Sequence, residues 1–269
     1  MSKAIRIRVR PKGAHDTSED TVNVGSAKTL CGRIFVLSVF VAPHHNPWRV
    51  ADIERQKQKV FEAERWLRMQ ALRYGKDVEF VNAAFGADGS FLDDDIPVGG
   101  HTRNSYYYAG NILRKMGFSD PQDFVRWTRC KAGCPQCLTI VFPNTCGRSF
   151  ASPVSRRLHS HNPVRYNLEG CIVYRKDDEG CTHETNPATV AHEMLHLFGA
   201  WDLYELDSGD RNRADKTALM FPNSIMLRTH CDIWQLQIDE INAWLVGLRD
   251  AGKDWYRWFE PHKDDYESG

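Results

Sequence analysis

The sequence predicts one α/β domain, because short apolar runs typical of buried strands alternate with stretches of helical periodicity. Runs rich in β-branched and aromatic residues predict strands at 33–42, 77–85, 138–142 and 170–175. The 50–74 stretch carries an apolar stripe at helical spacing and predicts a long helix. A chain of 269 residues can bury a full core. No internal repeat or flexible linker divides it, so a single compact domain is the simplest expectation.

The flanks and loops of this domain are polar. Residues 1–29 predict a polar N-terminal segment that is partly disordered or forms an edge strand, through the alternating piece at 5–10. Gly and Asp are frequent in 86–100, which predicts a loop. The segment 143–168 is rich in Pro, Ser, Arg, His and Asn, and it predicts a long loop with room for one irregular strand.

Residues typical of helix ends, together with apolar periodicity, predict three further helices. The first spans about 103–116 and ends at Gly117, and a short one follows Asp120, with a proline in its first turn. A helix over about 232–249 should close the core, since apolar residues recur along it at helical spacing. We expect an acidic, solvated loop ahead of this last helix, around Asp207, Asp210 and Asp215.

Charge and hydropathy exclude several classes of partner. Lys plus Arg equal Asp plus Glu at 35 each, which gives no support for binding nucleic acid or an anionic membrane. No apolar run approaches about 18 residues, so we expect no membrane-spanning helix. The basic N-terminus lacks the apolar stretch of a secretory signal. We therefore expect a cytoplasmic protein, or a secreted one if a leader was removed.

The eight cysteines admit several states. Four of them lie close together in the sequence: Cys130, Cys134, Cys137 and Cys146. Their spacing could hold a second, structural zinc ion, but disulfides or plain thiols are the alternatives. Cys171 and Cys181 flank a polar loop and could pair in an oxidising compartment.

One short stretch concentrates residues that bind metal ions. It reads His-Glu-x-x-His-x-x-Gly-x-x-Asp, from His192 to Asp202. Asn186 is a favourable N-cap and Pro187 suits the first helical position, so a helix should begin here and carry the motif to about residue 198. Residues four apart share one face of a helix, so His192 and His196 can bind the same ion.

The end of the motif supplies a third ligand. Gly199 can adopt a positive φ angle, so the helix can stop there and the chain can turn back. That turn would bring Asp202 to the two histidines. If Asp202 is not the ligand, nearby Glu205, Asp207 and His230 are the alternatives. An ordinary amphipathic helix with buried histidines would leave Gly199 and Asp202 unexplained.

The motif resembles that of the metzincin clan of zinc peptidases, and more narrowly the aspartate-ligand variant found in the snapalysin family. A candidate Met-turn at 224–226 and the order of the expected elements support the resemblance. It implies a metzincin-like α/β (α+β) fold: a mixed twisted sheet, a long backing helix, an active-site helix, a Met-turn and a C-terminal helix. The catalytic domain would span 30–269, with an upper subdomain over about 30–199 and a lower one over about 200–269.

The resemblance also implies a role for each residue of the motif. His192, His196 and Asp202 would bind one catalytic Zn²⁺, and Glu193 would act as the general base. Zinc lowers the pKa of a bound water toward about 7 and polarises a carbonyl, and a neighbouring carboxylate can then take the proton of that water.

Two residues beyond the motif complete the expected site. Met226 would form the hydrophobic floor under the metal, with Met220 as its rival, although a methionine in an apolar turn is usually core filling. Tyr204 matches a tyrosine that some aspartate-ligand members carry, and it would either stabilise the oxyanion or pack at the rim. One departure is Arg228, where some metzincins carry a tyrosine.

These expectations describe a zinc-dependent endopeptidase that hydrolyses peptide bonds through a metal-activated water. The substrate would be a protein or peptide, and a regulatory partner or narrow specificity would restrain the activity. Two alternatives remain on the same scaffold: a zinc hydrolase of a non-peptide amide, and a non-catalytic zinc-binding module. Glu193 argues against the second, because a structural zinc site needs no base.

Overall fold

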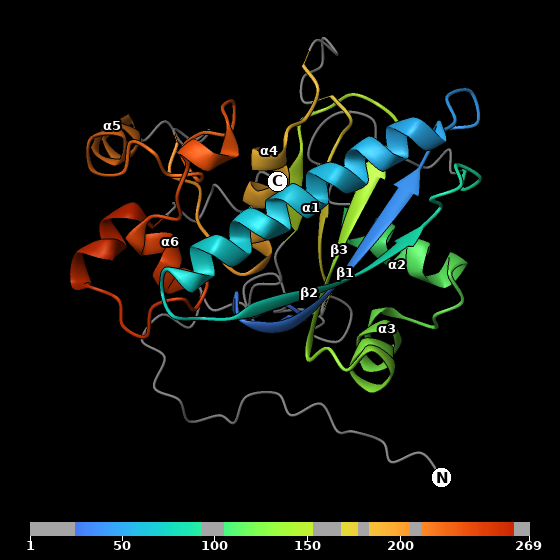
Figure 1. The fold of residues 1–269 in the computed structure, drawn as a ribbon, viewed down its shortest axis with the longest axis horizontal. Coiled ribbons are helices and arrows are strands. Elements are labelled where there is room, and N and C mark those ends of the chain that lie inside the picture. Colours follow the sequence, from blue (N-terminus) through green and yellow to red (C-terminus); the bar gives the residue numbers. More distant parts are fainter. Residues whose placement is uncertain (1–24, 93–104, 153–167, 177–182, 205–210, 261–269) are drawn as a thin grey trace.

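The computed structural model describes residues 25–92, 105–152, 168–176, 183–204 and 211–260. A five-stranded sheet forms the centre of this part of the chain, with helices on both faces (Figure 1). The strands are β1 (Gly32–Val41), β2 (Val78–Phe85), β3 (Gln136–Pro143), β4 (Phe150–Ser152) and β5 (Glu169–Ile172).

The sheet is mixed and mostly parallel. Its strand order is β2-β1-β3-β5-β4, and only β4 runs antiparallel, pairing Phe150 with Ile172 of β5. In the parallel part, Ile34 of β1 pairs with Phe80 of β2 and with Gln136 of β3. The short strand β4 therefore lies at one edge, where one side of its backbone has no partner strand within the sheet of described residues.

The interior strand β1 is mostly apolar from Ile34 onward because both of its faces are covered. Ile34 and Val36 belong to one hydrophobic core cluster, while Phe35 and Leu37, which point to the opposite face, belong to a second. This two-sided burial explains why the sequence shows a continuous apolar run here instead of alternation.

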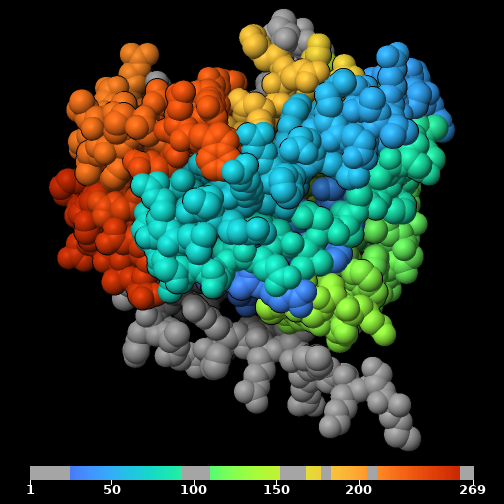
Figure 2. Space-filling view, in the orientation of Figure 1, coloured from blue at the N-terminus to red at the C-terminus, as the bar shows by residue number. Residues whose placement is uncertain are grey.

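Each face of the sheet has its own helices. The long helix α1 (Val50–Leu72) crosses the front of the sheet in Figure 1, beside α4 (Pro187–Leu197), against which it packs. α2 (Ser105–Lys115) and α3 (Pro121–Trp127) lie on the other side, where Phe124 joins the second core cluster. In Figure 2, α1 covers the near face, with residues from 211 onward gathered at one end of it.

The predicted fold class is confirmed. The four predicted strands appear as β1, β2, β3 and β5, and the irregular strand allowed for in 143–168 appears as β4. Asp120 caps α3 by accepting a hydrogen bond from the Asp123 N–H at 2.8 Å. Among the described residues, no helix is long and apolar enough to cross a membrane.

The prediction of one helix over 232–249 is wrong. The structure has a short 3-10 helix, Ile233–Gln235, and then α6 (Glu240–Leu245). Between them the chain is extended: the Ile225 N–H donates to the Gln237 carbonyl oxygen at 3.0 Å, and the Gln237 N–H donates to the Asn223 carbonyl oxygen at 2.9 Å. These bonds to another segment replace the helical ones, and Asp239 starts the helix anew as its N-cap.

A helix that the sequence did not predict, α5 (Arg211–Met220), precedes this region. It includes Asp215, which was expected in a loop, while residues 205–210 lie outside the described residues. Its buried positions are Arg213 and Thr217, and Leu219 is 84% exposed. The helix therefore packs through a polar seam and lacks the apolar stripe by which helices are recognised in sequence.

Both ends of the described chain pack onto the core. Ala27 and Leu30 are fully buried, and the Ala27 N–H donates to Oε2 of the buried Glu169 at 2.9 Å. Residues 1–24 lie outside the described residues. At the other end a 3-10 helix, Asp254–Phe259, buries Tyr256 and Phe259 while leaving Trp258 exposed.

Candidate metal centre

The helix that carries the motif begins where the sequence predicts. The side chain of Asn186 accepts a hydrogen bond from the Thr189 N–H at 2.9 Å, and Pro187 occupies the first helical position. Nearly all of α4 is buried, so its orientation is fixed by packing against α1 and the sheet. His192 and His196 therefore project from a rigid element.

The chain reverses at Gly199, as predicted. This glycine has φ = 100°, a conformation that side chains with a Cβ rarely adopt. The Ala200 N–H then donates back to the Leu195 carbonyl oxygen at 3.1 Å, which closes the helix end. The turn directs the next residues, up to Asp202, toward the face of α4 that carries the histidines.

Three ligand atoms meet at this point. His192 Nε2 lies 3.2 Å from Asp202 Oδ1, and His196 Nε2 lies 3.1 Å from the same oxygen. The two Nε2 atoms are 3.2 Å apart. Among the described residues, these three side chains form the group of His, Cys, Asp and Glu able to hold a metal ion. They are 8%, 13% and 19% exposed, so the group lies in a largely buried setting that is not sealed.

The backbone determines the protonation of both imidazoles. His192 Nδ1 lies 3.0 Å from the Ile225 carbonyl oxygen, and His196 Nδ1 lies 2.9 Å from the Ala200 carbonyl oxygen. A carbonyl oxygen can only accept, so each Nδ1 must carry the proton. In the neutral rings each Nε2 then presents a lone pair, and both lone pairs face the Asp202 carboxylate.

This arrangement fits a tetrahedral metal ion. With bonds of about 2.0–2.1 Å, neighbouring ligands in a tetrahedral site lie about 3.3–3.4 Å apart, close to the separations observed here. Oδ1 of Asp202 is buried and receives no hydrogen bond from neutral imidazoles. Three electron-rich atoms this close repel one another unless a cation lies between them.

The charges of the site point the same way. Burial lowers the pKa of His196, but the Asp202 carboxylate raises it more, to about 9. Burial raises the pKa of Asp202, but the two histidines together hold it well below its usual range. The group thus attracts a cation strongly, whether a proton or a metal ion.

Glu193 is buried beside this group. Its negative charge adds to the rise in the pKa of His196, after the larger effect of Asp202. The carboxylate is therefore close enough to act on the same space as the ligands. Its position next to His192 on α4 keeps it near the site without making it one of the three ligand atoms.

Tyr204 packs against His192. Its ring lies roughly parallel to that of His192, with centroids 6.3 Å apart, and its hydroxyl oxygen accepts a hydrogen bond from the Arg148 guanidinium at 3.3 Å. Burial, followed by the negative charges of Asp202 and Glu193, raises its pKa. The phenol is therefore neutral and keeps its own proton to donate.

The segment 224–226 forms a turn that contacts His192. Met226 is fully buried, and its carbonyl oxygen accepts a hydrogen bond from the Leu203 N–H at 2.9 Å. The carbonyl group of Ile225, the residue before it, is the one that holds His192. Its rival Met220 ends α5 and is 48% exposed, so it lies outside this turn.

Sequence reasoning missed Arg213. This buried residue of α5 donates from Nη1 to the Asp202 carbonyl oxygen and from Nη2 to the Tyr204 carbonyl oxygen, both at 3.0 Å. It thereby holds the backbone on both sides of Leu203. An isolated arginine in a polar stretch carries no sequence signal for such a contact.

Of the alternative third ligands, the structure describes only His230, and this residue does not join the group. His230 is exposed and is absent from it, while Glu205 and Asp207 lie outside the described residues. The ligand set that the structure brings together is therefore the one that the motif predicts.

Of the states open to the four clustered cysteines, the structure shows thiols and a disulfide and not a zinc site. Cys130, Cys134 and Cys137 are free thiols, while Cys146 is in a disulfide. Cys134 and Cys137 lie in the second core cluster and Cys130 is exposed, so their sulfur atoms do not converge. Burial raises the pKa of Cys137 to about 12, so it remains a thiol.

The pairing considered for Cys171 and Cys181 is wrong. Cys171 is a free, buried cysteine of β5, 2% exposed. Its side chain belongs to the core on the α1 face of the sheet. Cys181 itself lies outside the described residues.

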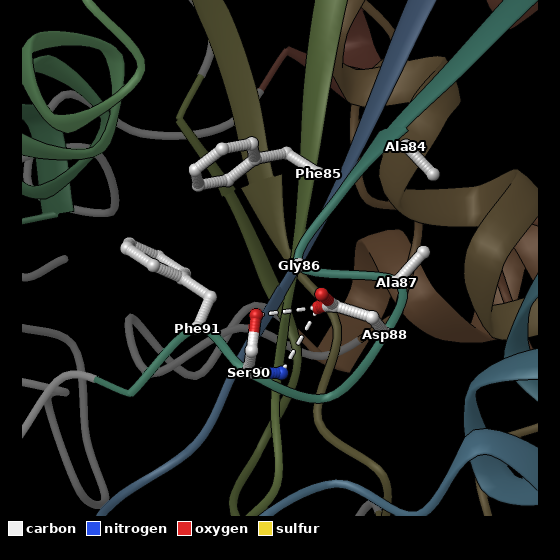
Figure 3. Close-up of a pocket in the computed structure, with 7 residues that line it drawn as sticks. All are labelled: Ala84, Phe85, Gly86, Ala87, Asp88, Ser90 and Phe91. Atoms are coloured by element: carbon white, nitrogen blue, oxygen red, sulfur yellow. Dashed lines mark hydrogen bonds between the residues drawn. The ribbon is translucent and has the colours of Figure 1, made fainter.

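A pocket of about 390 Å³ lies elsewhere, at the end of β2 (Figure 3). Phe85 and Phe91 meet edge to face there with ring centroids 4.8 Å apart, and Asp88 accepts hydrogen bonds from the N–H and hydroxyl of Ser90. Asp88 supplies the carboxylate among the residues that line this pocket, and this carboxylate is already hydrogen-bonded within the loop. The pocket includes none of the three metal-ligating side chains.

Comparisons with known proteins give little further information. No family model matches the chain, and no curated protein matches it. Among solved structures it is similar to that of metalloproteinase-II from Bacteroides fragilis, with 13% sequence identity and a TM-score of 0.39. The match covers 86% of this chain and 57% of that one, so the chain spans little more than half the length of that protein.

Proposed function

We propose that this protein is a zinc-dependent endopeptidase with its metal centre at His192, His196 and Asp202. The supporting observation is the convergence of the two imidazole Nε2 atoms and a carboxylate oxygen within 3.2 Å. Two nitrogens and one oxygen form a donor set that suits zinc, and three protein ligands leave a fourth position for water or substrate, as in catalytic zinc sites.

Zinc bound there would lower the pKa of a water molecule toward about 7 and polarise a substrate carbonyl group. Glu193 would take one proton from that water as the water oxygen adds to the carbonyl carbon. Glu193 would then donate this proton to the departing amine nitrogen as the C–N bond breaks. The products are a carboxylic acid and an amine, which become a carboxylate and an ammonium group when the acid proton passes to the amine, so the atoms balance without a further reactant.

Tyr204 is the residue that we propose to stabilise the oxyanion. Its raised pKa keeps the phenol protonated, and its hydroxyl oxygen is already oriented by Arg148. A donor aimed at the place where negative charge develops stabilises the transition state more than the ground state.

A peptide is the substrate that fits the surroundings of the site. The edge strand β4 packs against α4, which carries the two histidines. Backbone groups at the edge of a sheet can pair with an extended peptide, which adds to the sheet as a further strand. This favours a peptide over a small amide that has no backbone to pair.

Replacing the proposed base tests this function. Glu193→Gln should retain one zinc ion per chain but lose hydrolysis of an unfolded protein substrate by several orders of magnitude, because the amide cannot take a proton. The matched control is Glu184→Gln. Glu184 precedes α4 in the sequence, is exposed and forms an ion pair with Lys59. This variant should cleave like the wild type.

The outcomes distinguish the alternatives. Undiminished cleavage by the folded Glu193→Gln variant would contradict the mechanism. A wild-type protein that binds zinc but cleaves no peptide would favour a non-peptide amide or a binding role. Wild-type cleavage should stop with a chelator and return when zinc is added back.

A further inference from the structure

A buried polar cluster lies directly behind the candidate metal centre. Ser224 and Asn242 are fully buried, and Asp239 is 2% exposed. Burying a carboxylate is costly unless hydrogen bonds replace the water that it loses. The bonds that these three side chains make therefore show what the cluster holds in place.

Asp239 uses both of its carboxylate oxygens. Oδ1 accepts from the N–H groups of Ile241 at 3.0 Å and Asn242 at 2.9 Å, which caps α6. Oδ2 accepts from the Ser224 hydroxyl at 2.7 Å and from the Asn242 side-chain amide at 2.9 Å. Capping the helix requires only Oδ1, so the two bonds to Oδ2 serve something else.

The first of these bonds leads to the third ligand. The side-chain amide nitrogen of Asn242 donates to Asp239. The Oδ1 atom of Asn242 is therefore oriented to accept, and it accepts from the Trp201 N–H at 2.7 Å. Trp201 immediately precedes Asp202 in the sequence. The backbone entering the carboxylate ligand is thus fixed by a side chain of α6.

The second bond leads to His192. The Ser224 hydroxyl, which donates to Asp239, accepts from the Met226 N–H at 3.1 Å and so holds the turn closed. Two carbonyl oxygens of this turn accept hydrogen bonds. That of Ile225 accepts from His192 Nδ1 at 3.0 Å, and that of Met226 accepts from the Leu203 N–H at 2.9 Å. One carboxylate therefore connects to one histidine ligand and to the residues on both sides of the third ligand.

We infer that Asp239 and Asn242 are positioning residues of the metal centre, which hold His192 and Asp202 in place through the 224–226 turn and the Trp201 backbone. This inference rests on the proposed function, because it concerns the geometry of the same metal site. Residues behind a metal site that orient its ligands commonly change metal affinity about 10- to 100-fold when replaced.

Asp239→Asn separates positioning from capping. Asparagine is an equally good N-cap, but its NH₂ group cannot accept the bonds from Ser224 and Asn242. The folded variant should bind Zn²⁺ about 10- to 100-fold more weakly than the wild type. When Co²⁺ replaces zinc, its visible absorption bands should shift, because the ligand geometry has changed.

The matched control is Asp120→Asn, which replaces the N-cap of α3, a helix that packs in the second core cluster and not in the cluster that includes α4. It should keep the wild-type zinc affinity and cobalt spectrum. If Asp239→Asn does not fold, Ser224→Ala removes only the hydroxyl that links Asp239 to the turn. That variant should show the same spectral shift with a smaller loss of affinity.

Two results would overturn the inference, and they are distinguishable. If the wild type binds Zn²⁺ and Co²⁺ but the folded variants match its affinity and spectrum, the positioning role is wrong and the proposed metal site stands. If the wild type itself binds neither ion, the proposed function fails, and the inference fails with it.

Discussion

The Nδ1 atom of His192 lies 3.0 Å from the carbonyl oxygen of Ile225, in a turn that the sequence places beyond α5. This contact assigns the proton to Nδ1 and leaves Nε2 free to bind a cation. His196 has the same relationship with the Ala200 carbonyl oxygen. The backbone therefore orients both imidazoles as ligands.

Without metal, the stability of the protein should depend on pH through His196. Burial lowers its pKa but Asp202 raises it more, to about 9 from an ordinary value of 6.5. The protonated pair is thus fully stabilising below pH 6.5 and is lost as the pH rises through 9. The loss should be on the order of 3 kcal/mol in the free energy of unfolding.

Chemical unfolding of chelator-treated protein at several pH values would measure this loss. Asp202→Asn, which removes the partner carboxylate, should make this decline smaller, and saturating zinc should also reduce it. A metal-free wild type whose stability is constant from pH 6.5 to 9 would show that the pair is not coupled as the structure indicates.

Replacing the carboxylate ligand by a neutral one should change the pH dependence of catalysis. Asp202→His exchanges a negative ligand for a neutral imidazole and so leaves more positive charge on the metal. The pKa of the activated water should fall, which moves the acidic limb of the pH–rate profile to lower pH. The comparison requires a variant that still holds one zinc per chain, and an acidic limb that stays in place would contradict the idea.

Tyr204→Phe should impair turnover without affecting the metal. Loss of an oxyanion donor typically lowers kcat on the order of 10²-fold. Zinc affinity should be unchanged, since the hydroxyl bonds to Arg148 and is not one of the three ligands. Tyr74→Phe, which removes a hydroxyl bonded to the Ile238 carbonyl oxygen, is the control and should retain full activity. Unchanged kcat in Tyr204→Phe would leave only a packing role for this ring.

Met226 should contribute to stability by filling the space beneath the histidines. Met226→Ala should lower the free energy of unfolding by about 2–5 kcal/mol, whereas Met226→Leu should cost less than about 1.5 kcal/mol because it preserves volume. The half-exposed Met220 provides the matched control, and Met220→Ala should change stability by no more than about 0.5 kcal/mol. Denaturant titration of the three variants would rank them, and equal losses for Met226→Ala and Met220→Ala would contradict this role.

Local signals in the sequence predicted the centre of the fold well. The cap at Asn186, the turn at Gly199 and the spacing of His192, His196 and Asp202 are contained within one short stretch, and the structure reproduces them. The strands were equally accessible, because burial on both faces of the sheet leaves long apolar runs.

Two other features were out of reach because long-range contacts create them. The segment around Gln237 has helical periodicity, yet it is extended because it pairs with the backbone of Asn223 and Ile225. α5 has no apolar stripe. It is held instead by Arg213, which donates hydrogen bonds to the carbonyl oxygens of Asp202 and Tyr204. Such pairings depend on which segments meet in space, and no local pattern records them.

The cysteines show that a local spacing pattern can also suggest a site that the fold does not form. A spacing that suits a zinc site says nothing about where the sulfur atoms point, and Cys134 and Cys137 turn into the core beside β1. The chain should therefore hold one zinc ion and not two.

The zinc content of the purified chain tests the central claim most directly. Elemental analysis of the wild type should give one zinc per chain, and His196→Ala should give far less, while His183→Ala, a histidine ahead of α4 and outside the ligand group, should match the wild type. A wild-type chain that takes up no zinc, or a His196→Ala variant that retains the full amount, would contradict the metal centre proposed at His192, His196 and Asp202.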